Sequence, residues 1–249
     1  MTVQHPLFLP GVCADTITAA LSRAGGKEIG SGKFASEESS AALAVNTFGR
    51  FLGYPAELPP FPSLPDLDWP AVSVEVERQM RFPWAGGRHP WLDAGVETAT
   101  HLIGIESKRY EPFRDRKSVS LSKAYDRDVW GSGMRPYCQL RDALRDGSVR
   151  FAHLDAAQLV KHAYGLVTEG RRISKRPVLL YLYAEPAQRG SAPISQTALD
   201  RHRAEIAAFG QAVDGAAVQF AACSYREWLA GWPGSMRDHA DAVTAAFGP

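Results

Sequence analysis

The stretch that decides the fold is Trp91-Leu92-Asp93-Ala94-Gly95-Val96-Glu97, followed after four residues by Leu102-Ile103-Gly104-Ile105-Glu106-Ser107-Lys108. Both runs have the length and the apolar character of β-strands. The four residues that join them, Thr98-Ala99-Thr100-His101, are too few for anything but a turn. Together they predict a β-hairpin.

The hairpin brings two acidic residues together. A turn centred between Ala99 and Thr100 pairs Asp93 with Glu106, with Cβ atoms about 5 Å apart on one face of the sheet. Lys108 projects from the same face as Glu106, because side chains alternate along a strand. Two carboxylates so placed repel each other unless a positive charge lies between them. The arrangement therefore favours a hard divalent cation held by oxygen ligands, with Lys108 beside it.

Outward from the hairpin, further strands are predicted at residues 72–77, Pro177–Tyr183 and Val218–Cys223. Residues 72–77 alternate valine with serine or glutamate, which indicates one buried face. Pro177–Tyr183 is apolar almost throughout, which indicates a strand covered on both faces. Helices are predicted from apolar spacing and flanking stop signals, and they span Asp15–Ala24, Ala35–Leu52, Pro136–Asp146, Leu154–Val167, Gln196–Val213, Tyr225–Trp232 and Arg237–Phe247.

This order of elements predicts an α/β fold with a mixed central sheet flanked by helices, antiparallel at the hairpin and crossed over by helices afterwards. The 249 residues, 45% of them apolar, are enough for a single domain over 1–249. Within it, residues 1–34 form a helical extension and residues 225–249 form the C-terminal helices. Residues 54–70 contain six prolines and are expected to be an extended connector.

Composition argues for a soluble cytoplasmic protein that does not enter a membrane. The longest apolar run, Val178–Ala184, has seven residues, too few to span a bilayer. The N-terminal residues 1–6 lack the charged and apolar pattern of a signal peptide. Three widely spaced cysteines, Cys13, Cys138 and Cys223, form no disulfide framework and no zinc pair.

Several apparent motifs do not survive inspection. Gly30-Ser31-Gly32-Lys33 lacks the earlier glycine of a phosphate-binding loop, where Lys27 stands, and Phe34 replaces its hydroxyl residue. The seven histidines show no metal-ligand spacing. Asp115-Arg116-Lys117 repeats the acid-x-Lys triplet, but it lies in a fully charged run and is expected to be a solvated loop.

Asp93, together with Glu106-Ser107-Lys108, resembles the active site of the PD-(D/E)XK nuclease superfamily, whose members have a restriction-endonuclease-like fold. That family places an Asp on the second core strand and Glu-x-Lys on the third, within an αβββαβ core. Pro90 stands three residues before Asp93 rather than next to it, a departure at a residue that does no chemistry. In order of elements, the resemblance extends over residues 35–224.

Two further runs resemble a bacterial branch of the superfamily described as restriction endonucleases. They are Gly104–Lys108 with the following Tyr110-Glu111-Pro112-Phe113, and Ser39–Asn46. The resemblance implies a metal-dependent DNA endonuclease. It implies Mg²⁺, or Mn²⁺ as a substitute, bound by Asp93, Glu106 and the backbone carbonyl of Ser107.

In that chemistry, Lys108 would orient or deprotonate the attacking water and stabilise the transition state. Acidic neighbours favour a charged Lys108, and hence the orienting role. Glu77 is expected to assist the metal, with Glu75 as the competing choice, since both lie on one face of a strand. The alternative is that both glutamates lie on a solvent-facing strand edge.

Two auxiliary residues are weaker candidates. Family members often place a carboxylate on the helix before the first strand, which would here be Glu38; acids also favour a helix N-terminus for electrostatic reasons alone. Related nucleases can place a glutamine on the helix after the hairpin, which points to Gln158, beside Lys161 and His162. A core or surface role is the alternative for this second group.

Charge is distributed unevenly along the chain. The balance is −4 over residues 1–80, +7 over 81–176 and −2 over 177–249. A basic middle segment predicts a surface for the phosphate backbone of DNA. Its candidate contacts are Arg109, Arg114, Arg171, Arg172, Lys175 and Arg176.

The six tryptophans are not interleaved with the basic residues, which favours double-stranded over single-stranded DNA as the partner. A homodimer is compatible with the sequence. Two other functions stay open: a catalytically silent module that binds nucleic acid or protein on the same fold, and a nuclease of repair or RNA processing.

Overall fold

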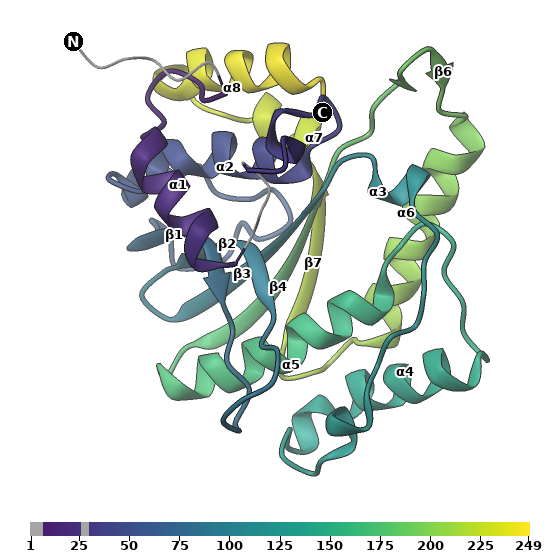
Figure 1. The fold of residues 1–249 in the computed structure, drawn as a ribbon. Helices are drawn as coiled ribbons and strands as arrows, with labels where there is room; N and C mark the ends of the chain where they lie inside the picture. The colour runs from purple at the N-terminus through teal and green to yellow at the C-terminus, as the bar shows by residue number, and fades with distance from the viewer. Residues whose placement is uncertain (1–6, 26–29) are drawn as a thin grey trace.

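The computed structural model describes residues 7–25 and 30–249, and a five-stranded sheet runs through its centre (Figure 1). Neighbouring strands pair antiparallel from the first to the third and parallel from the third to the fifth. In spatial order the strands are β1 (Ser73–Gln79), β2 (Trp91–Glu97), β3 (His101–Lys108), β4 (Arg176–Tyr183) and β7 (Gln219–Ser224).

Two layers of helices cover the sheet (Figure 1). One layer consists of α1 (Ala14–Arg23), α2 (Ser40–Phe48), α7 (Tyr225–Ala230) and α8 (Gly234–Phe247). The other consists of α4 (Arg135–Asp146), α5 (Ala156–Arg172) and α6 (Gln196–Ala212). A mixed central sheet between helical layers confirms the predicted α/β class.

Strand β4 shows how the sequence pattern builds this sandwich. Val178, Leu180 and Leu182 pack into the core on the α2 side, and Leu179 and Tyr181 pack into the core on the α5 side. All five side chains are buried. The apolar run therefore forms a strand covered on both faces, as predicted.

The hairpin has the predicted register. Ala94 pairs with Ile105 and Gly95 with Gly104, so the β2–β3 turn lies where the sequence indicated. The elements outside the hairpin differ mainly at their ends. The expected helix over 35–52 is shorter, because Ser39 caps α2 by accepting a hydrogen bond from the Ala42 N–H at 3.1 Å.

Other boundaries also moved. Helix α5 begins after Asp155, whose carboxylate accepts from the Gln158 N–H at 2.9 Å, and runs to Arg172 instead of Val167. Two elements have no counterpart among the predicted ones: the short helix α3 (Glu111–Arg114), and the hairpin of β5 (Gln188–Arg189) and β6 (Ala192–Pro193).

The proline-rich connector, residues 54–70, packs in part into the core. Leu58, Phe61 and Leu64 are buried in the core on the α2 side. The connector therefore contributes side chains to this core.

In the part of the chain that is described, no helix has both the length and the apolar character needed to cross a membrane. Residues 1–6, on which the signal-peptide expectation rests, and Lys27 of the rejected phosphate-loop motif lie outside the described residues.

Candidate active site

The candidate site forms where β2 separates from β3. Their pairing ends at Ala94 and Ile105, whereas β3 stays paired with β4 as far as Lys108. Asp93 lies just beyond the last pair, and its Oδ2 accepts a hydrogen bond from the Ser107 N–H at 2.6 Å. The Asp93 carboxylate thus binds the backbone of β3 at the point where the strands part.

Ser107 faces both sides of this junction. Its Oγ lies 2.7 Å from the Tyr225 hydroxyl, so the side chain belongs to the α7 layer. Its N–H points to β2, and the N–H and C=O of one strand residue point the same way. The Ser107 carbonyl therefore points to the β2 side of β3, the side on which Asp93 lies.

A backbone irregularity lies in β1, which flanks Asp93 on the side away from β3. Glu77 has a φ of 50°, in the left-handed region, and it interrupts the β1–β2 pairing between Val76 and Arg78. Alternation changes phase here: Ala94 packs on the α2 side, but Leu92, two residues earlier, packs on the α5 side. The hairpin therefore presents Asp93 at a kink rather than on a regular face.

The kink distinguishes the two glutamates of β1. Glu75 is exposed and pairs with Arg78 at 3.3 Å. Glu77 is half-buried and close enough to Asp93 to raise the pKa of that carboxyl. Glu75 and Glu77 were expected to share a strand face; the left-handed residue separates them, and Glu77 is the neighbour of the site.

Glu106 is buried and held from two sides. Lys108 forms a close ion pair with Oε1, and His162 Nε2 of α5 lies 2.9 Å from Oε2. Burial acts to raise the pKa of Glu106, but Lys108 and then His162 outweigh it and lower the pKa to about 2. Glu106 is therefore an anion between two basic groups.

Asp93 is in the opposite situation. Burial and the like charge of Glu106 raise its pKa well above the ordinary value, and Lys108 opposes them only in part. Burial acts to lower the pKa of Lys108, yet Glu106 and Asp93 raise it overall. The site thus holds a charged lysine, an ionised Glu106 and an Asp93 whose negative charge is disfavoured, and a cation would favour that charge.

Helix α5 reaches Glu106 because two glycines allow close packing. A Cβ on Gly104 of β3 would lie 2.3 Å from Leu92 and 2.7 Å from Leu166, and one on Gly165 would lie 2.7 Å from Met80. At Gly165 the obstacle includes the Cβ and the backbone oxygen of Met80, so a larger residue would push α5 away from the sheet. The close packing brings His162 to the buried carboxylate.

A cavity of about 410 Å³ adjoins the site through His162, which forms part of its wall. Gln158 and Lys161 line it from the same face of α5, and Trp91 lines it from the start of β2. The structure therefore brings Gln158 beside the site, in the cavity wall.

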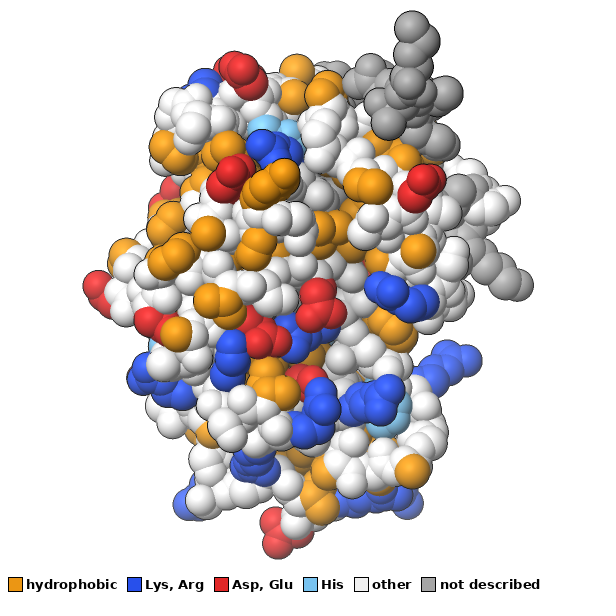
Figure 2. All heavy atoms as spheres, turned by 90° about the vertical axis from the view of Figure 1, so that its left-hand side faces the viewer, with side chains coloured by type: hydrophobic (Ala, Val, Ile, Leu, Met, Phe, Trp, Pro, Cys, Tyr) orange, Lys and Arg blue, Asp and Glu red, His pale blue; other side chains and the backbone are white. Residues whose placement is uncertain are grey.

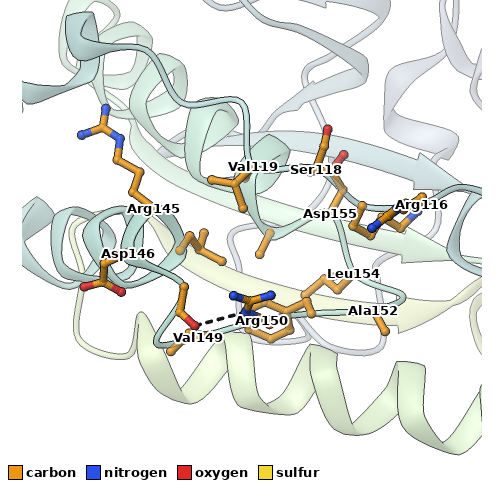
Figure 3. A pocket seen from close by; sticks show the side chains of 16 residues that line it. Arg116, Ser118, Val119, Arg145, Asp146, Val149, Arg150, Ala152, Leu154 and Asp155 are labelled. Carbon is orange, nitrogen blue, oxygen red and sulfur yellow. Dashed lines mark hydrogen bonds between the residues drawn. The ribbon is translucent and has the colours of Figure 1, made fainter.

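A second cavity, of about 530 Å³, lies at the N-terminal end of α5 (Figure 3). Arg116, Lys117 and Arg150 contribute basic side chains to its wall, and Asp155 contributes an acidic one. Arg145 also borders it, but its guanidinium points away and binds Asp126 and the Ser122 carbonyl. Lys117 donates to the Glu111 carbonyl at 2.6 Å.

The donor set suits Mg²⁺ better than a metal that needs many protein ligands. Nowhere in residues 7–25 and 30–249 do three or more His, Cys, Asp or Glu side chains form a ready metal centre. Mg²⁺ commonly binds one or two carboxylates and keeps several waters. Asp93, Glu106 and the Ser107 carbonyl fit that pattern once Lys108 releases Glu106.

Among the described residues, the contacts of the Glu38 carboxylate are with arginines and not with Asp93 or Glu106. Helix α2 begins after it, and its carboxylate pairs with Arg114 at 2.9 Å and with Arg189 at 2.6 Å. A nearby acid that sequence reasoning missed is Glu111. It accepts from Ser40 Oγ at 2.5 Å and from the Arg109 N–H at 2.9 Å, and its charge helps to raise the pKa of Lys108. Its sequence signals are its position three residues after Lys108 and its place in the Tyr110-Glu111-Pro112-Phe113 run, for which no role at the site is predicted.

The predicted DNA contacts do not form one track. Arg109 is buried, with 6% of its surface exposed, and donates to the carbonyls of Glu37 and Phe247, so its side chain braces the fold. Arg114 is exposed, and its guanidinium pairs with Glu38 at 2.9 Å and with Asp115 at 2.6 Å.

The basic run at the end of α5 lies at the far end of the sheet. Arg176 pairs with His101, at the opposite end of β3 from Lys108, about 23 Å away at 3.3 Å per residue. Lys175 pairs with Glu97 at 2.7 Å, and Arg171 donates to the Trp130 carbonyl. On the side of the molecule at the left of Figure 1, Lys and Arg gather over the lower half with Asp and Glu among them (Figure 2).

Comparison with known proteins gives no match: no family model, no curated protein and no solved structure is similar to the chain. The likeness to PD-(D/E)XK nucleases therefore stays a prediction from a few residues.

Proposed function

We propose that the protein is a Mg²⁺-dependent endonuclease that hydrolyses DNA phosphodiester bonds, with Asp93, Glu106 and Lys108 as its catalytic residues. One observation carries the proposal. Two carboxylates and a charged lysine meet at the edge where β2 leaves β3, and one of these carboxylates is held there against its electrostatic preference. Such arrangements concentrate at functional sites.

Asp93, Glu106 and the Ser107 carbonyl would hold the ion, with Glu77 able to act through a water. A bound Mg²⁺ supplies charge neutralisation at the phosphate oxygens and a water that ionises near neutral pH. Lys108 stays protonated because its acidic neighbours raise its pKa. It therefore orients the attacking water and stabilises negative charge, and does not act as the base.

The DNA backbone has a new candidate contact surface. Arg116 is exposed and forms no ion pair within the described residues, and Arg150 bonds only the Gly147 carbonyl, at 3.3 Å. Both line the cavity at the N-terminal end of α5. The same helix carries His162, which contacts Glu106. These two residues, with Arg114 and Lys117, replace the run at 171–176 as the proposed phosphate contacts.

The direct test is cleavage of plasmid, linear duplex, single-stranded DNA and RNA, with and without Mg²⁺ or Mn²⁺. Asp93→Asn and Lys108→Met should each lower the rate about 10³-fold. Glu75→Gln is the matched control, since this exposed glutamate lies two residues from Glu77 and should leave the rate unchanged. Equal cleavage by the parent and both site variants would refute the assignment.

One observation favours a second function. Both oxygens of Glu106 already contact basic groups, Lys108 and His162, as they would in a binding module that has lost catalysis. Calorimetric titration with Mg²⁺ separates the two. A nuclease should take up the ion and lose that uptake in Asp93→Asn, whereas a silent module should take up none.

A further inference from the structure

The cavity that adjoins Glu106 through His162 has a wall unlike that of a duplex-binding surface. Its volume, about 410 Å³, is in the range of sites for a single small molecule or nucleotide. A cavity of this size can hold one unpaired nucleotide, but it cannot hold a base pair that stays stacked in a duplex.

An aromatic side chain is placed to stack on such a nucleotide. Trp91 is half-buried, lines the cavity, and lies two residues before Asp93 on the same strand. Within the described residues its ring contacts no other aromatic ring, whereas Tyr125, also in the wall, is braced by stacking on Tyr164 at 5.8 Å. An aromatic ring can stack on any base, so this contact does not depend on the sequence of the DNA.

The charges of the wall suit a phosphate-bearing ligand. Arg88 and Lys161 line the cavity, and neither forms an ion pair within the part of the chain that is described. None of the described residues that line it is an aspartate or a glutamate. A negative ligand would therefore meet two basic side chains without displacing an acidic partner.

Polar groups on the remaining wall can meet the edge of a base. Ser120 and Ser122 come from the segment after α3, and Gln158 comes from α5. A glutamine side chain both donates and accepts hydrogen bonds, so it can bind any base. His162 connects this wall to Glu106, at 2.9 Å.

We infer that this cavity binds one unpaired nucleotide of a DNA strand next to the bond to be cut. The inference rests on the proposed nuclease function and narrows its substrate. The enzyme then acts on single-stranded, frayed or flap DNA in preference to intact duplex, which reverses the expectation drawn from the distribution of tryptophans along the chain.

The test measures binding apart from chemistry. Fluorescently labelled oligothymidylate and a duplex of equal length are titrated with the full chain in EDTA, and anisotropy is recorded. The parent should bind the single strand more tightly than the duplex. Trp91→Ala should weaken single-strand binding about tenfold and leave duplex binding unchanged, because only the unpaired base stacks.

Two further variants keep the test decisive. Trp91→Phe retains a stacking ring and should restore most of the affinity. Tyr54→Ala, which removes an exposed aromatic side chain that does not line this cavity, should behave like the parent. Should Trp91→Ala fail to fold, Lys161→Gln replaces it, with an expected loss of a few-fold that shrinks at high salt.

The outcomes separate the cavity from the catalysis. Tighter binding of duplex by the parent, or single-strand binding that is equal in the parent and Trp91→Ala, would overturn the inference. Single-strand binding that depends on Trp91, without cleavage of any substrate in Mg²⁺, would support the cavity and refute the nuclease. Cleavage of duplex without a role for Trp91 would do the reverse.

Discussion

At the open end of the β2–β3 hairpin, Asp93 accepts a hydrogen bond from the Ser107 N–H, and burial and the like charge of Glu106 raise its pKa. At the closed end, Asp68 reaches the turn and its pKa is lowered: burial opposes ionisation, but hydrogen bonds from Thr98, His101 and Thr100 outweigh it. Near one end of the hairpin, therefore, the surroundings disfavour the charged form of a carboxyl group, and near the other end they stabilise it.

The closed end is satisfied in detail. Asp68 accepts from Thr98 Oγ1 and from the Thr100 N–H, both at 2.6 Å. Glu97 lies between Arg78 at 2.5 Å and Lys175 at 2.7 Å. Charges here stabilise the turn. Since stabilising the fold does not require the disfavoured charge at Asp93, that end is where a ligand is expected.

The largest effect on stability is expected at the open end. Glu106→Gln leaves Lys108 buried without its carboxylate and should lower the free energy of unfolding by about 3 kcal/mol. Glu97→Gln, which also removes a carboxylate between two basic groups, is the control. It should cost less because Glu97 is more exposed than Glu106.

Urea unfolding of the two variants measures the difference. The double variant Glu106→Gln/Lys108→Met should regain part of the loss, because the unpaired charge is gone. Equal losses for Glu106→Gln and Glu97→Gln would remove the distinction between the two ends of the hairpin.

The next effect compares basic residues at the two ends. Arg116→Glu with Arg150→Glu should weaken DNA binding about 30-fold and reduce the dependence of log affinity on log salt by about two. Arg171→Glu with Arg172→Glu makes the same change in charge at the end of α5 and should have a much smaller effect. Binding isotherms at several salt concentrations decide; a larger loss from the second pair would restore the run at 171–176 as the DNA contact.

How much of this could be read from the sequence depends on the range of the contacts. The hairpin register follows from the spacing within 91–108, and it holds. The placement of Glu38 does not follow from local pattern. Its partners Arg114 and Arg189 are 76 and 151 residues away, and no sequence feature near Glu38 predicts these contacts.

The basic run and the kink illustrate the same limit. Residues 171–176 lie far from Lys108 because of the parallel register of β3 and β4, which joins segments more than 60 residues apart. The left-handed φ of Glu77 is unusual for glutamate. Strict alternation along a regular strand predicts instead that Glu75 and Glu77 share one face. Long-range pairing and local strain are what a single sequence conceals.

A smaller effect is expected at the closed end. Asp68→Asn loses part of its charged hydrogen bonding to the turn and should cost about 1.5 kcal/mol. Because the folded pKa of Asp68 lies below its unfolded value, its contribution is present above about pH 4 and disappears as the pH falls.

Chemical denaturation between neutral pH and pH 3 measures this. The difference between parent and Asp68→Asn should shrink as the pH falls. A constant difference would mean that Asp68 acts through shape and not through charge.

The smallest effect has the opposite sign. Asp93→Asn keeps an oxygen for the Ser107 N–H but removes the negative charge that burial and Glu106 disfavour. In EDTA it should therefore stabilise the protein by about 0.5–1 kcal/mol, or a rise in melting temperature of about 2 °C. Mg²⁺ should stabilise the parent by mass action and leave the variant unaffected. A variant that is less stable than the parent in EDTA would show that Asp93 supports the fold as Asp68 does, and the contrast between the two ends of the hairpin would no longer distinguish a functional carboxylate from a structural one.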